Sequence, residues 1–271
     1  MVFRAESSAQ QSADRGPRQT MNAVFEKSNL MTALSGYGWR PGLNLAAARL
    51  EVGRTISLNV ALKAGVEYVF LASGPDELAD VDLYLRDTDG RVLAEDLEDD
   101  GTPVVEFTAT RTATYQLQLH LAAGESAAAY VALSILRRGG HQVIEQAYHG
   151  TTAGFFAAAD RLLLPDTGAR WQKQEGTWCL FGFSLQEKQG ASLQNLQPNG
   201  KKTFFAAAGQ KATQINLYLA DDNDRIVAMT DRPEPYPLLS HQTVSNAVYD
   251  LRIETTRART HKLVLLGVFE K

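Results

Sequence analysis

The feature that most constrains this chain is an internal duplication. The segment VDLYLRDTDGRVLAED (residues 81–96) reappears as INLYLADDNDRIVAMT (215–230), so Ile215 corresponds to Val81. The same spacing relates TYQLQL (114–119) to VYDLRI (248–253) without a gap. Because a repeat of this length is a structural unit in its own right, the sequence predicts two domains of one architecture.

Two further matches extend the duplication in both directions. Upstream, GVEYVFLASG (65–74) aligns with GKKTFFAAAG (200–209), and downstream YVALSIL (130–136) aligns with LVLLGVF (263–269). Each of these matches needs a shift of one residue, as insertions in turns would produce. Each repeat therefore extends over roughly a hundred residues, the size of a small β domain.

Both copies alternate apolar and polar side chains, the pattern of antiparallel strands with one buried and one wet face. Asp- and Gly-rich segments such as DTDG and DDND separate these runs and predict tight turns. We therefore expect an all-β dominated protein of two tandem antiparallel β-sandwiches. The residues expected on the buried faces are Val81, Leu83 and Leu85; Tyr115, Leu117, Leu119 and Leu121; and Tyr249, Leu251 and Ile253.

Two segments outside the repeats indicate helix. Residues 141–165 are Ala-rich, with apolar side chains at helical spacing on both sides of a Gly-Thr-Thr break. A second helical pattern begins at Met21 and continues to Leu34. The expected organisation is an N-terminal tail with a short helix (1–36) whose first 16 or so residues are disordered, a first sandwich (37–139), a helical connector (140–170) that fixes the sandwiches together, and a second sandwich (171–271).

Composition narrows the functional classes. A formal net charge of -4 and a pI near 5.8 provide no basic footprint for nucleic acid. No apolar run approaches the roughly 18–20 residues of a membrane span, and the N-terminus as given lacks the apolar segment of a secretory signal. The single cysteine, Cys179, lies in the apolar segment GTWCLFGF and is expected to be a buried structural thiol.

The segments GVEYVFLASG, DVDLYLRDTDG, TATYQLQL and AAYVALSI resemble, in this order, the bacterial pre-peptidase C-terminal domain. The resemblance covers residues 65–136 well and 200–269 more weakly. It implies a jelly-roll-like sandwich that is usually an accessory module of secreted bacterial proteins, related to the collagen-binding domains of clostridial collagenases. The second copy departs from the pattern, with Gln214, Asn216 and Asp224 where the first copy has Asp80, Asp82 and Gly90.

The function that the resemblance implies is binding or scaffolding without catalysis. We expect a component of a bacterial envelope or secreted complex that works outside the cytoplasm, with a protein partner or a second copy of the chain. The alternative is a module that binds carbohydrate or extracellular matrix, with or without calcium.

An acidic stretch at residues 76–100 carries the calcium alternative. Asp80 and Asp82 project from the same face of a strand, and Ca²⁺ prefers six to eight oxygen ligands. Asp87 and Asp89 follow in the adjoining turn and complete the candidate ligand set. The competing interpretation is that the strand carboxylates face solvent and that Asp87 and Asp89 form side-chain hydrogen bonds within the turn.

Aromatic side chains carry the carbohydrate alternative. Tyr84 and Tyr218 occupy equivalent positions on the wet face of the same strand, and Tyr236 lies in the turn segment RPEPYP. Together with Tyr37 and Trp39 they could form a stacking surface for a glycan or an extended peptide. The competing interpretation is that these rings pack against other elements.

No catalytic motif accompanies the five histidines. The sequence contains neither G-x-S-x-G nor H-E-x-x-H, and a lone cysteine cannot form a Cys pair. His141 and His149 lie eight residues apart in the connector and could share a helix face, but no third metal ligand is near. The sequence therefore predicts that the protein is not an enzyme and has no resident cofactor besides the candidate calcium.

Overall fold

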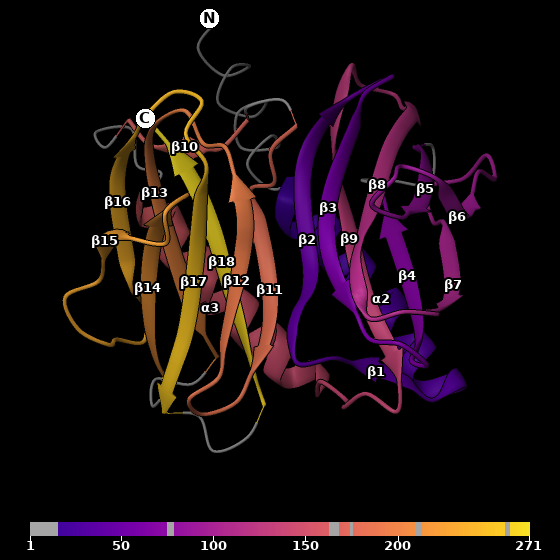
Figure 1. Ribbon diagram of the computed structural model, residues 1–271, viewed down its shortest axis with the longest axis horizontal. Coiled ribbons are helices and arrows are strands. Elements are labelled where there is room, and N and C mark those ends of the chain that lie inside the picture. Colours follow the sequence, from indigo (N-terminus) through magenta and orange to yellow (C-terminus); the bar gives the residue numbers. More distant parts are fainter. Residues whose placement is uncertain (1–15, 75–78, 163–167, 174–175, 210–212, 258–260) are drawn as a thin grey trace, which may run out of the picture. The chain divides into compact units, whose positions relative to one another are not determined.

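A computed structural model describes residues 16–74, 79–162, 168–173, 176–209, 213–257 and 261–271. Strands dominate, and the chain divides into two compact units. The first unit comprises residues 1–37 and 47–139, and the second comprises 38–46 and 140–271. Figure 1 shows each unit as layers of antiparallel strands, indigo to magenta in the first and orange to yellow in the second.

Two layers of four strands form the first copy of the repeat, which coincides with the first unit except that residues 42–46 of its first strand group with the second unit. One layer has the order β3-β8-β5-β6, and the facing layer has the order β2-β9-β4-β7. Each of these pairs of strands whose register is known is antiparallel. The strands are β2 (Gly42–Glu51), β3 (Thr55–Leu62), β4 (Glu67–Ser73), β5 (Asp80–Arg86), β6 (Val92–Asp96), β7 (Val104–Thr108), β8 (Ala113–Ala123) and β9 (Ala128–Arg138), preceded by the short β1 (Tyr37–Trp39).

The second unit repeats this arrangement. One layer has the order β12-β17-β14-β15, and the other has the order β16-β13-β18-β11, with the short β10 paired to β18. The strands are β10 (Arg170–Trp171), β11 (Leu180–Leu185), β12 (Gly190–Leu196), β13 (Gly200–Ala208), β14 (Gln214–Asp221), β15 (Ile226–Met229), β16 (Leu238–Thr243), β17 (Tyr249–Arg257) and β18 (Lys262–Glu270).

The strand orders confirm the predicted sandwiches and show that both are jelly rolls. In each unit the first, eighth, third and sixth strands form one layer, and the second, seventh, fourth and fifth form the other. The register also revises the sequence alignment. Leu71 pairs with Val104 and Phe205 pairs with Leu238, so β4 and β13 correspond at the spacing that relates Val81 to Ile215 and need no shift.

Side-chain alternation follows the prediction. Val81, Leu83 and Leu85 of β5 are fully buried, and the same holds for the apolar positions of β8. Cys179 is also buried, and burial raises the pKa of its thiol to about 12, which keeps the thiol protonated. None of the described helices is long and apolar enough to cross a membrane.

The N-terminal helix α2 (Gly16–Ser35) packs on the first unit, against β9 and β4. Met21, Val24 and Phe25 are buried as predicted, whereas Leu30 and Leu34 are exposed. The buried stripe continues instead through polar residues. Ser28 Oγ, for example, donates to Val24 O at 2.7 Å and lies 2.7 Å from Ser134 Oγ, so the hydroxyl is satisfied without an apolar partner. The disorder predicted for the first 16 or so residues falls almost entirely outside the described part of the chain.

The connector contains one continuous helix, α3 (Glu145–Leu162), which packs on β18 and β13 of the second unit. The predicted break at Gly-Thr-Thr is therefore wrong. Thr151 Oγ1 donates to Ala147 O at 2.8 Å and Thr152 Oγ1 donates to Tyr148 O at 2.7 Å, so both hydroxyls are satisfied within the helix.

The predicted domain boundaries also change. Helix α2 is part of the first unit and α3 is part of the second, so the expected 1–36 tail and 140–170 connector are not separate regions. Residues 38–46 group with the second unit, because Trp39 forms a backbone bridge to His141 and Leu45 lies against Gly182. A Cβ at Gly182 would lie 3.0 Å from Leu45 Cβ, which makes this contact specific to glycine.

Candidate functional site

The outer face of the β3-β8-β5-β6 layer holds a hydrogen-bonded pair that joins the predicted residue Asp82 to His120. Asp82 of β5 and His120 of β8 are register partners, and His120 Nδ1 lies 2.8 Å from Asp82 Oδ2. Their side chains are 13% and 27% exposed, so the pair is shielded but reachable. This arrangement fixes both rotamers on a rigid sheet and leaves polar atoms directed to solvent.

Tyr84 extends this cluster along β5. Its hydroxyl donates to Asp82 Oδ2 at 3.4 Å, and the Arg86 guanidinium carbon lies 5.2 Å from its ring centroid. Arg86 Nε in turn donates to Gln118 Oε1 at 3.0 Å. We call Asp82, Tyr84, Arg86, Gln118 and His120 the first-unit face. It combines an aromatic ring with carboxylate, amide, imidazole and guanidinium groups.

Asp80 borders the first-unit face. Its pKa lies above the ordinary value, chiefly because the carboxyl group is partly buried and secondarily because Asp82 is negatively charged. One of its oxygens, Oδ1, is buried and has no hydrogen-bond partner among the described residues. Asp80 and Asp82 thus lie close together, as the calcium hypothesis requires of its two strand ligands.

Asp87 and Asp89 lie in the adjoining turn. Asp87 Oδ1 accepts hydrogen bonds from the backbone N–H groups of Asp89 and Arg91 at 3.0 and 2.9 Å, the turn role that the competing interpretation gave it. Within the described residues, no three side chains of His, Cys, Asp or Glu are grouped closely enough to hold a metal ion. The geometry thus brings Asp80 and Asp82 together but does not join Asp87 and Asp89 to them in a ligand shell.

The second unit presents a different face at the equivalent positions. Asn216 stands in place of Asp82 and pairs in register with Glu254, which is the counterpart of His120 in the repeat. Asn216 Nδ2 donates to the Tyr218 hydroxyl at 3.0 Å, which reverses the direction of the Tyr84–Asp82 hydrogen bond. We call Asn216, Tyr218, Arg252 and Glu254 the second-unit face. It keeps the tyrosine and lacks the carboxylate–imidazole hydrogen bond across the strands.

The other aromatic candidates differ in their exposure to solvent. Tyr236 is 38% exposed, whereas Tyr37 is 4% exposed and Trp39 is fully buried. Tyr37 and Trp39 are therefore core residues rather than part of a stacking surface, because their short strand packs into the sandwich. Tyr84 and Tyr218 remain half-buried within their separate faces.

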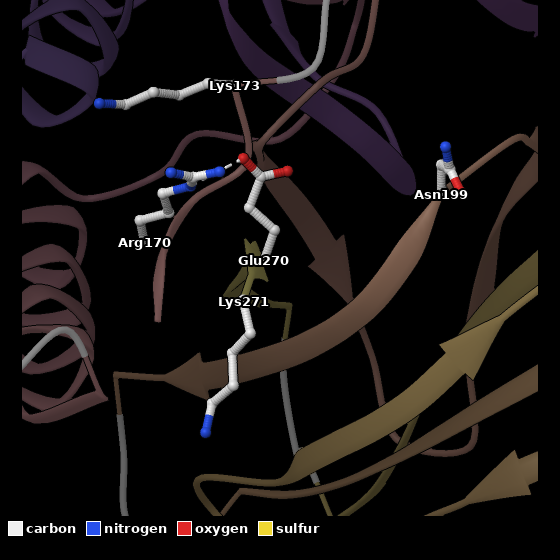
Figure 2. A pocket seen from close by; sticks show the side chains of 5 residues that line it. All are labelled: Arg170, Lys173, Asn199, Glu270 and Lys271. Carbon is white, nitrogen blue, oxygen red and sulfur yellow. Dashed lines mark hydrogen bonds and ion pairs between the residues drawn. The ribbon is translucent and has the colours of Figure 1, made fainter. Parts of the chain in front are cut away.

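A basic pocket, missed from the sequence, lies in the second unit between the start of β10 and the end of β18. Its volume is about 620 Å³, and Figure 2 shows its five lining side chains. Trp171 anchors β10 by packing its ring 4.4 Å from that of Phe269, which holds the neighbouring Arg170 beside Glu270. The lining residues are Arg170, Lys173, Asn199, Glu270 and Lys271. No sequence motif marks this pocket, because segments far apart in the chain supply its residues.

A second group missed from the sequence is a serine between two histidines. Ser184 Oγ lies 2.6 Å from His141 Nε2 and 3.3 Å from His261 Nδ1, and the two imidazole rings stack at 3.9 Å. Ser184 is only 1% exposed, whereas both histidines are partly exposed, so the group runs from the interior to the surface. His141 precedes α3, so it does not share a helix face with His149, and His149 lies 3.4 Å from Glu145 instead.

Comparisons with known proteins add little to this geometry. No family model and no curated protein matches the chain. One similar solved structure is a periplasmic inhibitor of g-type lysozyme from Aeromonas hydrophila, at 16% identity and a TM-score of 0.27, covering 36% of this chain and 90% of that one. The PBSX exported protein XepA has 11% identity and a TM-score of 0.29, covering 84% and 85%.

A third similar structure is the tandem CBM22 region of Xyn10C from Paenibacillus barcinonensis. It has 13% identity and a TM-score of 0.22, covering 88% of this chain and 94% of that one. Likenesses of this degree carry no argument about function. The fold assignment therefore rests on the strand orders of the two units.

Proposed function

We propose that the protein is a non-catalytic binding protein that works outside the cytoplasm, in a bacterial envelope or secreted complex. Both units have the jelly-roll strand order that the resemblance to pre-peptidase C-terminal domains implies. The ligand class that we propose is a glycan, bound on the first-unit face. The observation that carries this proposal is the shielded Asp82–His120 pair beside the half-buried ring of Tyr84.

The chemistry of the first-unit face suits a sugar. An aromatic ring can stack on the apolar C–H face of a pyranose, and carboxylate, amide and imidazole groups can exchange hydrogen bonds with its hydroxyls. Asp82, Gln118 and Arg86 are already held by hydrogen bonds on neighbouring strands, so little side-chain entropy is lost on binding. These groups lie along the outer face of a sheet, where an oligosaccharide could contact several of them at once.

The test is binding of the full chain to an array of neutral and acidic oligosaccharides. We expect Tyr84→Ala to weaken binding roughly tenfold or more, a loss of about 1.4 kcal/mol. The matched control is Tyr218→Ala at the equivalent position of the second unit, which should change affinity less than about twofold. Equal losses in both variants, or no binding of any oligosaccharide by the wild-type protein, would reject a glycan site on the first-unit face.

A protein partner is the second candidate, favoured by strand β15. This strand lies at the edge of its sheet and exposes Ile226, Val227 and Met229, which are 52%, 39% and 54% exposed. An apolar edge strand can pair with a strand of another chain. Sedimentation of the wild-type protein and of Val227→Lys tests self-association. A concentration-dependent dimer that the variant abolishes supports pairing between copies, and a monomer throughout rejects it.

A further inference from the structure

The basic pocket of the second unit has an unusual charge balance for this chain. Three basic side chains, those of Arg170, Lys173 and Lys271, line the pocket together with the Glu270 side chain, and the buried Lys202 pairs with Glu270 from inside the protein. The chain as a whole carries a formal net charge of -4. The positive charge is therefore a local feature of this concave site rather than a property of the whole surface.

The Glu270 carboxylate is fully engaged inside the protein. Its Oε2 accepts from Lys202 Nζ at 2.9 Å, and its Oε1 accepts from Arg170 Nε at 3.2 Å. The Lys202 side chain is 1% exposed and comes from the central strand β13, so this part of the pair is structural. A buried lysine requires such a partner, and Glu270 consequently has little capacity left to neutralise other cations.

The pKa of Glu270 agrees with this assignment. Burial acts to raise it, but the hydrogen bond and charge of Lys202, the backbone N–H of Lys173 and the charge of Arg170 together hold the pKa below its ordinary value. Glu270 therefore stays ionised at neutral pH and remains committed to Lys202 and Arg170. In the described part of the chain, no ion pair involves Lys173 or Lys271, and both residues are exposed.

Figure 2 shows Arg170 directed toward the Glu270 carboxylate, whereas the ammonium groups of Lys173 and Lys271 point away from it in different directions. Figure 2 shows Lys173 and Lys271 on different sides of Glu270, with the Asn199 amide on a third side. Arg170 uses Nε for Glu270, and its side chain is 68% exposed, so the outer guanidinium nitrogens face solvent. The donors are separated in space around an open depression of about 620 Å³ at the surface.

From this geometry we propose that the pocket binds a small ligand bearing two or more oxyanion groups, with Lys173, Lys271 and the free edge of Arg170 as its cationic contacts. One anionic group would lie between Arg170 and Lys173, and another would lie toward Lys271, with Asn199 as an uncharged donor. Separated cations favour a ligand with separated charges over a single monovalent ion. This site is independent of the glycan proposed for the first-unit face.

The test is calorimetric titration of the full chain with inorganic pyrophosphate, inorganic phosphate and citrate at constant ionic strength. Pyrophosphate and citrate distinguish a phosphate-bearing from a carboxylate-bearing ligand. We expect saturable binding of at least one of these two, tighter than that of phosphate, and weaker at higher salt. The Lys173→Gln/Lys271→Gln variant should bind roughly tenfold more weakly or worse.

Two controls keep the result interpretable. Lys63→Gln removes an exposed lysine that does not line the pocket and should leave the affinity unchanged. Tryptophan fluorescence melts should show that the double variant is folded, since Lys173 and Lys271 make no buried contact that folding requires. Non-saturating binding by every variant, or equal affinity in the wild-type protein and the double variant, would overturn the proposal. Failure of the glycan array would not affect it.

Discussion

In the first unit a tyrosine occupies an inward position of β4, whereas the equivalent position of the second unit holds a lysine. Tyr68 is 4% exposed, and its hydroxyl accepts the backbone N–H of Lys63 at 3.0 Å. Lys202, its counterpart on β13, is 1% exposed and pairs with Glu270 on β18. The first unit satisfies the buried hydroxyl of Tyr68 with a backbone N–H group. The second unit satisfies the buried ammonium group of Lys202 with a carboxylate.

The outer faces of the two units also differ in the residues that lie opposite each other across the strands. The first-unit face pairs Asp82 with His120 across the strands, whereas the second-unit face sets the neutral Asn216 opposite Glu254. Apolar positions and turn geometry survive the duplication, whereas the charged residues of the outer face stand at different positions in the two copies. Burial of apolar surface maintains the fold in both copies, which leaves polar positions free to diverge in function.

The strongest test of this comparison is Glu270→Gln. The variant leaves Lys202 buried with no ionised partner, and we expect a loss of about 3 kcal/mol in the unfolding free energy of the second unit. All three tryptophans, Trp39, Trp171 and Trp178, belong to this unit, so tryptophan fluorescence during urea unfolding follows it selectively.

The pH dependence of the unfolding free energy of Glu270→Gln tests whether the lost stability comes from the ionised carboxylate. Because the folded pKa of Glu270 is depressed, its contribution is complete above the unfolded pKa and is lost as the pH falls through the folded pKa. The difference between wild type and Glu270→Gln should therefore shrink in acid. The double variant Lys202→Met/Glu270→Gln should recover most of the lost stability, since it removes both charges together. A single variant as stable as wild type at neutral pH would refute the buried-charge interpretation.

A smaller effect on stability is expected at the turn between β5 and β6. Gly90 has φ +81° in the first unit, and its equivalent, Asp224, has φ +62° in the second. Gly90→Asp should cost about 1 kcal/mol, because a residue with a Cβ is strained in this region. Thermal denaturation of the first unit, followed by circular dichroism, measures the change. The control is Gly124→Ala, at a glycine without positive φ and with no neighbouring atom closer than 3.8 Å to an added Cβ.

Asp80→Asn should have a smaller effect, of opposite sign. The raised pKa of Asp80 means that the folded state favours its protonated form, so its stabilising contribution is present below the unfolded pKa and is lost as the pH rises through the folded pKa. The neutral variant should therefore be more stable near pH 7, by less than about 1 kcal/mol for a partly solvated group. Denaturation at pH 4 and pH 7 tests this. A variant less stable than wild type at pH 7 would show that the carboxylate has a stabilising partner.

Added calcium should have the smallest effect on stability. Asp80 and Asp82 are adjacent, but Asp87 is committed to turn hydrogen bonds, so we expect millimolar CaCl₂ to leave the melting temperature unchanged. The control is MgCl₂ at the same concentration. A rise with Ca²⁺ alone that Asp82→Asn abolishes would reinstate the calcium site of the first copy.

Much of the fold could be predicted because period-2 patterns and Asp-rich turns are local signals. The alternation in β5 and β8, the tandem sandwiches and the burial of Cys179 follow from them. The continuous helix α3 was missed because Gly150, Thr151 and Thr152 disfavour helix locally, while tertiary packing and hydroxyl hydrogen bonds within the helix override that preference. Strand pairing was also beyond the sequence, since it joins segments such as β4 and β9 that are distant in the chain.

The candidate sites also differ in how far the sequence could predict them. Asp82 and Tyr84 were identified because they lie within the repeated motif, but the partner of Asp82, His120, depends on the register of β5 and β8. The basic pocket gathers residues 170, 173, 199, 270 and 271, and the group around Ser184 gathers residues 141 and 261. Such groups have no spacing that a linear pattern could reveal.

The allocation of residues 38–46 to the second unit has a consequence for the history of the chain. A fragment of residues 140–271 would lack Trp39, which is fully buried, and Leu45, which lies against Gly182. Excision of residues 37–139 would remove them as well. A fragment that keeps the second unit intact must therefore include residues 38–46. A recombination event that separates the two copies must transfer this short segment or build a replacement for it.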